Sequence, residues 1–165
     1  MNQPADDDES EQARLARNMA ELLQELRVAQ TGVQIMFAFL LSAVFTNRFA
    51  RATAFQSTTA IVTVLLTTAS AALLMAPAAW HRLYFRQGRR IDIIEWGNRF
   101  AVAGLALLAA AMTGAVLLVT DTVVGGWPAV LMSGCSGALF ALVWFALPLA
   151  RRARAPGNDI AKGRD

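Results

Sequence analysis

Polar side chains that could hold a proton or a small cation gather at the edges of the apolar stretches of this sequence. Gln30 and Gln34 stand one helical turn apart, so they lie on one face of a helix. The imidazole of His81 changes charge near neutral pH and would be the titrating member. We expect one inner-edge network, comprising Glu25, Arg27, Gln30, Gln34, His81, Glu95, Asn98 and Arg99. It could form a vestibule for ions, or it could only solvate the interface and hold helices in register.

A second set carries hydroxyl groups at helical spacing in the next apolar stretch. The set follows Gln56 and consists of Thr59, Thr63, Thr67 and Ser70. Hydroxyls in apolar helices commonly bond back to the carbonyl four residues earlier. The stripe could therefore be structural, or it could face a partner helix or a thin file of water.

Small residues form a third pattern, which predicts close helix packing. They recur in the fourth apolar stretch at Ser133, Gly134, Gly137 and Ala141, beside the single Cys135, and in the third at Ala103, Ala106, Ala110 and Gly114. These faces could pack within one chain or join copies of it.

No ionisable side chain lies in the middle of an apolar stretch. Ion-coupled transporters normally keep a carboxylate at that depth, where this chain has Phe37, Ala38 and Phe39. The sequence also lacks a Cys/His cluster with metal-ligand spacing, a phosphate loop and a nucleophile elbow. We therefore expect no enzyme, no cofactor and no metal site. Asp121, the one acidic residue at the opposite edge, is expected to cap backbone donors.

Four charge-free stretches must position these side chains. No Asp, Glu, Lys or Arg occurs in residues 28–47, 52–80, 100–120 or 122–150, and 56% of the chain is apolar. A membrane span needs about 20 mostly apolar residues, whereas a soluble helix shows charges on its outer face. The sequence predicts an all-α membrane protein, a four-transmembrane-helix bundle over residues 28–150, with spans at about 28–46, 57–80, 98–120 and 127–150.

The flanking segments differ in composition from the spans. Residues 1–10 are expected to form a disordered acidic tail, and residues 151–165 a basic, disordered tail. Residues 11–30 have apolar positions every three or four residues, which predicts an amphipathic cytoplasmic helix. We expect it to turn near Thr31-Gly32 into the first span as one continuous or slightly bent helix.

Lysine and arginine are distributed very unequally over the two sides. Thirteen of the 15 lie in the N-terminal arm, the central connection and the tail, and the other two are Arg48 and Arg51. The positive-inside rule then places both termini in the cytoplasm and the chain, multi-pass, in the cytoplasmic membrane. The basic edge should gather anionic lipid, which explains the net charge of +3 without nucleic acid as a partner.

Several short segments, taken in order, resemble a family of small four-span membrane proteins of unknown function found mainly in actinobacteria. The segments are ELLQELRVAQTGVQIMFAFLL, MAPAAWHRLYFR, GNRFAVAGLALLA, LVTDTVVG and WFALPLARR. The resemblance implies a cytoplasmic membrane location and a four-helix bundle, and some relatives carry a sodium:proton antiporter label. From the residues, we expect a non-enzymatic scaffold or modulator of a membrane assembly, alone or as a homo-oligomer. The alternative is a cation- or proton-coupled transporter or channel.

Overall fold

The computed structural model describes residues 4–84 and 90–154, and every regular element in these ranges is a helix. In chain order they are α1 (Pro4–Val44), the 3-10 helix η1 (Phe49–Arg51), α2 (Ala54–Tyr84), α3 (Arg90–Val123), α4 (Gly126–Phe140), the π-helix η2 (Ala141–Ala146) and α5 (Leu147–Arg154). Four helical segments are long and apolar enough to cross a membrane, which indicates a multi-pass membrane protein. They are Leu23–Val44, Ala54–Trp80, Trp96–Val123 and Gly126–Arg151.

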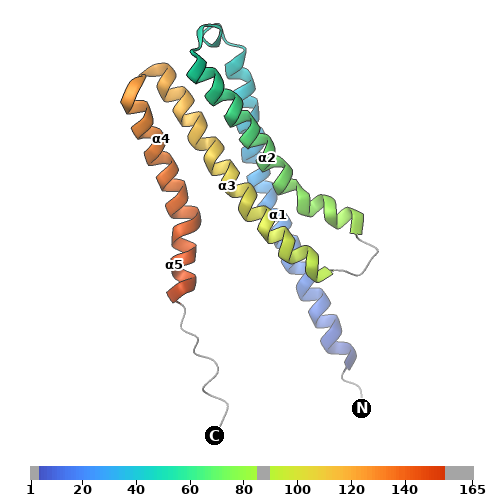
Figure 1. The fold of residues 1–165 in the computed structure, drawn as a ribbon. Coiled ribbons are helices and arrows are strands. Elements are labelled where there is room, and N and C mark those ends of the chain that lie inside the picture. The colour runs from blue at the N-terminus through green and yellow to red at the C-terminus, as the bar shows by residue number, and fades with distance from the viewer. Residues whose placement is uncertain (1–3, 85–89, 155–165) are drawn as a thin grey trace.

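Helix α1 is continuous from the polar N-terminal region into the first apolar segment. Thr31 and Gly32, near which a bend of the helix into the first span was expected, are helical, and the Thr31 hydroxyl donates to the Arg27 carbonyl at 3.1 Å. The helix begins at Pro4, inside the segment expected to be disordered. Proline suits a first helical turn because the missing N–H would have no partner there. The N-terminal part of α1 extends past the ends of the other helices (Figure 1).

Helices α2 and α3 form the most closely packed pair. Their buried residues alternate in steps of three and four, the spacing of left-handed helix packing. The residues of this series are Ala60, Thr63, Thr67, Ser70, Leu74 and Pro77 on α2, and Gly97, Ala101, Gly104, Leu108, Ala111, Ala115 and Leu118 on α3. Ala109 of α3 is also buried but does not belong to the series.

Glycine on α3 brings the two backbones together. A Cβ at Gly114 would lie 2.5 Å from Thr63 Oγ1, and one at Gly104 would lie 2.8 Å from Leu74 Cγ. Of the small residues expected to form a packing face on α3, Gly114 lies in this contact, whereas Ala103, Ala106 and Ala110 are exposed and do not pack within the chain. Since α3 has small residues on every side, their spacing alone does not identify the face in contact.

Helix α1 covers one side of this pair through two apolar clusters. Toward the end of the molecule at which α1 begins and α5 ends, called the inner end, Leu26 and Val33 pack with Leu74, Ala101 and Leu108. Toward the outer end, Leu40 packs with Ala60 and Leu118. Only 11% of the apolar window of α1 is buried, so most of its circumference faces away from the rest of the chain.

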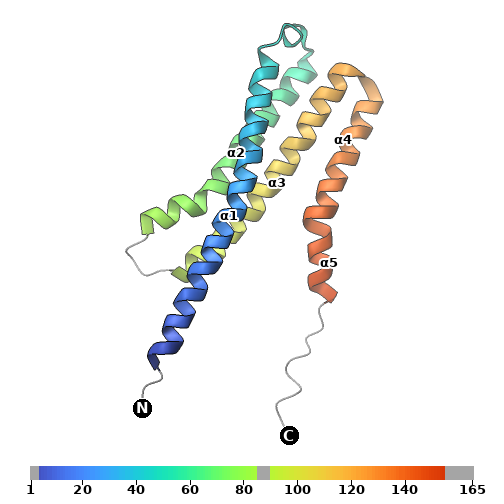
Figure 2. The same cartoon turned by 180° about the vertical axis from the view of Figure 1, so that it is seen from behind.

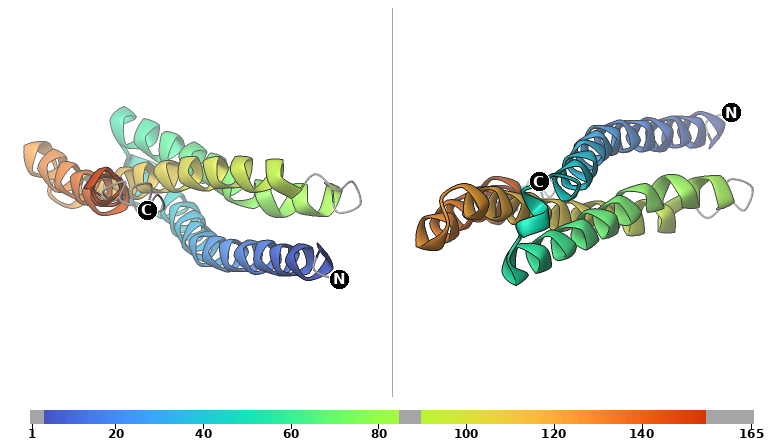
Figure 3. Two further views of the ribbon diagram at one scale, coloured as in Figure 1. Left: turned by 90° about the horizontal axis from the view of Figure 1, so that it is seen from below. Right: turned by 90° about the horizontal axis from the view of Figure 1, so that it is seen from above.

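The fourth apolar segment lies beside α3, away from the N-terminal end of α1 (Figures 2 and 3). Ser133 is buried, and a Cβ at Gly137 would lie 3.2 Å from Thr113 Cγ2, whereas Gly134 and Ala141 of the same expected face are exposed. Only 6% of the apolar window is buried, so the four helices form an open arrangement rather than a closed bundle.

Cys135, expected to be a small packing residue, is also exposed on this segment. The π-helix η2 ends at Ala146, two residues before Pro148. A proline ring displaces the carbonyl four residues before it, which accounts for the altered hydrogen-bond register at this point.

Candidate functional site

The hydroxyl stripe of α2 lies in the buried contact between α2 and α3, which we call the dry seam. Thr63, Thr67 and Ser70 are 1%, 0% and 0% exposed. Thr63 Oγ1 donates to the Thr59 carbonyl at 2.6 Å, and Thr67 Oγ1 donates to the Thr63 carbonyl at 2.8 Å. Ser70 Oγ reaches across to the Gly104 carbonyl at 2.7 Å. Each of these three donors is therefore satisfied by protein, and Thr59 itself is half-buried at the edge of the seam.

Gln30 and Gln34 are neighbours on α1 but have different surroundings. Gln30 Nε2 donates to the Leu74 carbonyl on α2 at 3.2 Å. Leu74 lies three residues before Pro77, which sits inside α2 and supplies no N–H to the helix ladder. The N–H missing at Pro77 would bond to the Leu73 carbonyl, so the Leu74 carbonyl is not the one that the proline leaves without a donor. The Gln30 bond is therefore an additional link between α1 and α2, one residue further along. Gln34 is exposed on the adjoining face.

The other inner-edge residues are not drawn into one network in the part of the chain that the structure describes. Glu25, Arg27 and Asn98 are exposed. Arg99 lies over the Trp96 ring, 5.3 Å from its centroid, and Trp96 in turn is close to Phe100. The side chains of His81 and Glu95 lie outside the described residues.

At the outer end, a polar clasp that we did not expect joins the start of α2 to the end of α3. Thr53 precedes α2 and accepts from the Gln56 N–H through Oγ1 at 3.2 Å, while Gln56 Oε1 accepts from the Thr53 N–H at 3.1 Å. This is a capping box, which satisfies two otherwise free donors of the first helical turn. Gln56 Nε2 also donates to Asp121 Oδ2 at 3.0 Å. Asp121 is thus held by a side chain of α2, not by the turn that follows it.

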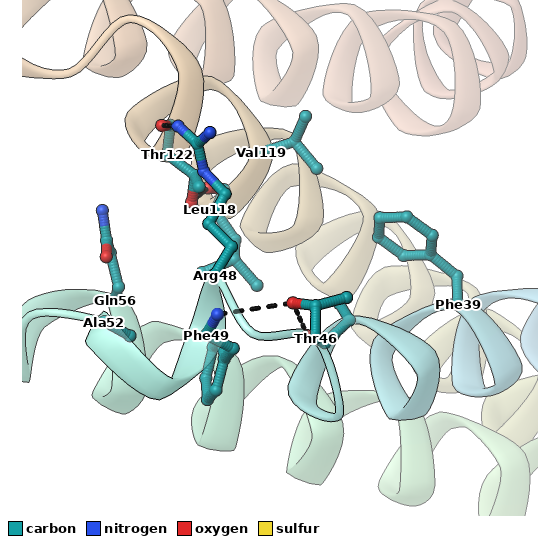
Figure 4. A pocket seen from close by; sticks show the side chains of 10 residues that line it. Phe39, Thr46, Arg48, Phe49, Ala52, Gln56, Leu118, Val119 and Thr122 are labelled. Carbon is teal, nitrogen blue, oxygen red and sulfur yellow. Dashed lines mark hydrogen bonds between the residues drawn. The ribbon is translucent and has the colours of Figure 1, made fainter.

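Arg48 closes the same region from the connection between α1 and α2. Its Nη2 donates to the Thr122 carbonyl on α3. Beneath it is a cavity of about 110 Å³, with Phe39 at one side (Figure 4). The lining is mostly apolar, with polar atoms from Thr46, Arg48, Gln56 and Thr122. This geometry ties the outer ends of three helices together.

Two arrangements therefore carry the polar chemistry, the dry hydroxyl seam and the outer clasp. In the described residues, no group of three or more His, Cys, Asp or Glu side chains could hold a metal ion. The capping box had a sequence signal, threonine followed three residues later by glutamine before an apolar run. The contact of Gln56 with Asp121 had none, since 65 residues separate them.

The comparison with family models gives one match, which covers residues 8–148. The matched model is described as a family of unknown function, DUF6328. The chain belongs to the DUF6328 family. The match takes in all four apolar segments of this DUF6328 chain except the last three residues of the fourth. No curated protein and no solved structure matches it.

The clasp of this DUF6328 protein gives a first prediction. Gln56→Ala should lower the free energy of unfolding in detergent by about 1–2 kcal/mol, because it removes both the cap and the bond to Asp121. Gln56→Glu keeps the capping acceptor but places a carboxylate against Asp121, so it should also destabilise. Thermal unfolding followed by circular dichroism measures both. Thr58→Ala, at an exposed position two residues after Gln56, is the control. Equal stability of Gln56→Glu and the unmodified chain would contradict the contact between Gln56 and Asp121.

Proposed function

We propose that this chain is a non-enzymatic membrane protein that scaffolds or modulates a larger membrane assembly. The observation that carries the proposal is the dry seam between α2 and α3. A water-filled ion path needs polar groups that water and ions can reach. Here the hydroxyls of Thr63, Thr67 and Ser70 are buried and bonded to carbonyl oxygens.

The exposed helix faces support the same proposal. The first and fourth apolar segments have 11% and 6% of their windows buried. A small protein with so little internal contact offers most of its lateral surface to lipid or to neighbouring membrane proteins. Helix faces with small residues are suited to the second use, because they let backbones approach closely.

We further propose that the chain lies in the cytoplasmic membrane with both termini in the cytoplasm. An even number of spans puts the start of α1 and the end of α5 at one end of the molecule (Figure 1). The excess of arginine at that end assigns it to the cytoplasm. The same residues would gather anionic lipid there.

Ion flux in everted vesicles tests the proposal against the cation- or proton-coupled transporter, the activity that an antiporter label on relatives would imply. A dye follows a preformed pH gradient as sodium or potassium is added, with a known exchanger in parallel vesicles as positive control. We expect no flux above empty vesicles once insertion of the chain is verified. Cation-dependent collapse of the gradient that is lost in Thr67→Val or His81→Ala would overturn the scaffold. Thr67→Val keeps the packed shape and removes only the hydroxyl, so it separates an ion path from a packing role.

A further inference from the structure

Helix α1 carries a second stripe at the spacing of helix–helix packing, on the side that faces away from the chain. Its first stripe, Leu26, Val33 and Leu40, is buried against α2 and α3. The second stripe advances in steps of three and four over about five turns, the pattern of a two-helix seam. Every member is exposed, and we call this set the outer stripe: Gln24, Arg27, Thr31, Gln34, Ala38 and Leu41 of α1, with Phe45 directly after its last residue.

The amide of Gln34, in the outer stripe, would be stabilised by a hydrogen-bonding partner. Arg27, seven residues before Gln34, is the last charged residue before the charge-free run of residues 28–47. At about 1.5 Å per residue, Gln34 is about 10 Å beyond Arg27 and therefore inside the hydrocarbon layer, on the inner side of its middle. A primary amide that faces lipid there loses its hydrogen bonds to water without replacement, which is costly. Gln30, one turn earlier, has its partner in the Leu74 carbonyl.

We propose that the outer stripe of α1 is the contact surface for a second copy of this chain, with the two Gln34 amides hydrogen-bonded to each other. Copies inserted in one membrane have the same orientation, so a two-fold axis relating them runs along the membrane normal. The two α1 helices are then parallel, and each residue of the stripe meets its own counterpart. A glutamine amide both donates and accepts, so two of them complement each other across such an axis.

The neighbours of Gln34 fit a close parallel contact. Ala38, one turn toward the outer side, is small enough to let the backbones approach. Thr31, one turn toward the inner side, already donates its hydroxyl to the Arg27 carbonyl and can pack without a further partner. Arg27 lies near the inner end of the segment, where its long side chain reaches water and lipid phosphate, so two copies are not held charge against charge.

The exposed face of α4 does not make the same case. Gly134 and Ala138 stand four residues apart there, and nothing lies within 4 Å of a Cβ placed on Gly134. Its exposed side chains are small or apolar, so lipid satisfies them as well as protein would. The outer stripe of α1, by contrast, carries an exposed amide within the charge-free run. The inference rests on the proposed function and deepens it, because it names a copy of the chain as one partner in the assembly.

Cysteine cross-linking in native membranes tests the dimer. Cys135 is the single cysteine, so Cys135→Ala gives a background free of thiols. Thr31→Cys and Ala38→Cys place a thiol on the outer stripe, and Val28→Cys and Phe39→Cys place one at nearby levels on another exposed face. Oxidation with copper phenanthroline should give a disulfide dimer from the two stripe variants and not from the two others. Equal cross-linking at all four positions, or none at the stripe, would overturn the proposal.

The role of the amide is tested in the Ala38→Cys background. Gln34→Leu should lower the association constant about 3- to 30-fold, the range that corresponds to one interhelical hydrogen bond of about 0.6–2 kcal/mol in membranes. Ile35→Leu, at the adjacent exposed position, is the matched control and should leave cross-linking unchanged. Undiminished cross-linking in Gln34→Leu would overturn the Gln34 pair. The two proposals can fail separately. If neither cross-links nor ion flux are found, the dimer is wrong and the scaffold stands. If ion flux is found, the scaffold is wrong, and the cross-links still decide whether the dimer forms.

Discussion

Gly114→Val is expected to lower the free energy of unfolding of the detergent-solubilised protein by about 3 kcal/mol, the upper end of the usual range for overpacking. A Cβ at position 114 would stand 2.5 Å from Thr63 Oγ1. Thr63 is 1% exposed, β-branched and bonded to the Thr59 carbonyl, so it cannot swing aside. The helices α2 and α3 must separate instead. Unfolding by sodium dodecyl sulfate titrated into mixed micelles, followed by tryptophan fluorescence, measures the loss.

The matched control for this prediction is the same substitution where there is room. Gly134→Val places the larger side chain where no atom lies within 4 Å of the Cβ, and its effect should stay within about 0.5 kcal/mol. Thr63→Ala in the Gly114→Val background should recover part of the stability, because it removes the atoms that the valine meets. Equal effects at positions 114 and 134 would mean that α2 and α3 do not meet at Gly114.

Leu74→Ala is expected to cost about 2–5 kcal/mol in the same titration. Leu74 is 0% exposed and belongs to the cluster that joins α1, α2 and α3 near the inner end. Truncation there leaves a cavity between three helices, and close contact is what holds helices together in lipid. At low concentrations of sodium dodecyl sulfate, before unfolding begins, the helical content should equal that of the unmodified chain, because each helix keeps its own backbone hydrogen bonds.

Two comparisons make the second prediction specific. Met75→Ala, the adjacent position at 58% exposure, should change stability by no more than about 0.5 kcal/mol. Gly104→Ala alone should destabilise, because its Cβ would lie 2.8 Å from Leu74 Cγ, but it should be tolerated in the Leu74→Ala background. Strictly additive effects of the two substitutions would contradict direct contact between these residues.

Gln30 and Gln56 have structural roles in this chain, as links between helices. Each amide bridges two helices, Gln30 to the Leu74 carbonyl near Pro77 and Gln56 to Asp121. Both bonds lie near an end of a helix packing contact, where they hold the register that the glycines permit. Gln34 has the same chemistry on the adjoining, exposed face of α1, which is why we assign it the same task between two chains.

The sequence by itself determined the helical class and the positions of the four apolar segments. Charge-free gaps are a direct consequence of the cost of burying a charge in hydrocarbon, so the expected spans differ from the observed apolar segments by only a few residues at each end. The largest difference, the start of the first segment at Leu23 instead of residue 28, falls where the amphipathic region runs into the span without a break.

Only the tertiary structure decided which faces meet. In a soluble helix the contrast between apolar and polar residues identifies the buried side. A membrane helix is apolar all round, so its sequence lacks that contrast. Small residues on α3 therefore pointed to Ala103 and Ala106, whereas Ala111 and Ala115 are buried. In the same way, spacing put Gln30 and Gln34 on one face, about 40° apart around α1. The structure puts the edge of the buried side between them, so Gln30 is partly buried and bonded to Leu74 whereas Gln34 is exposed.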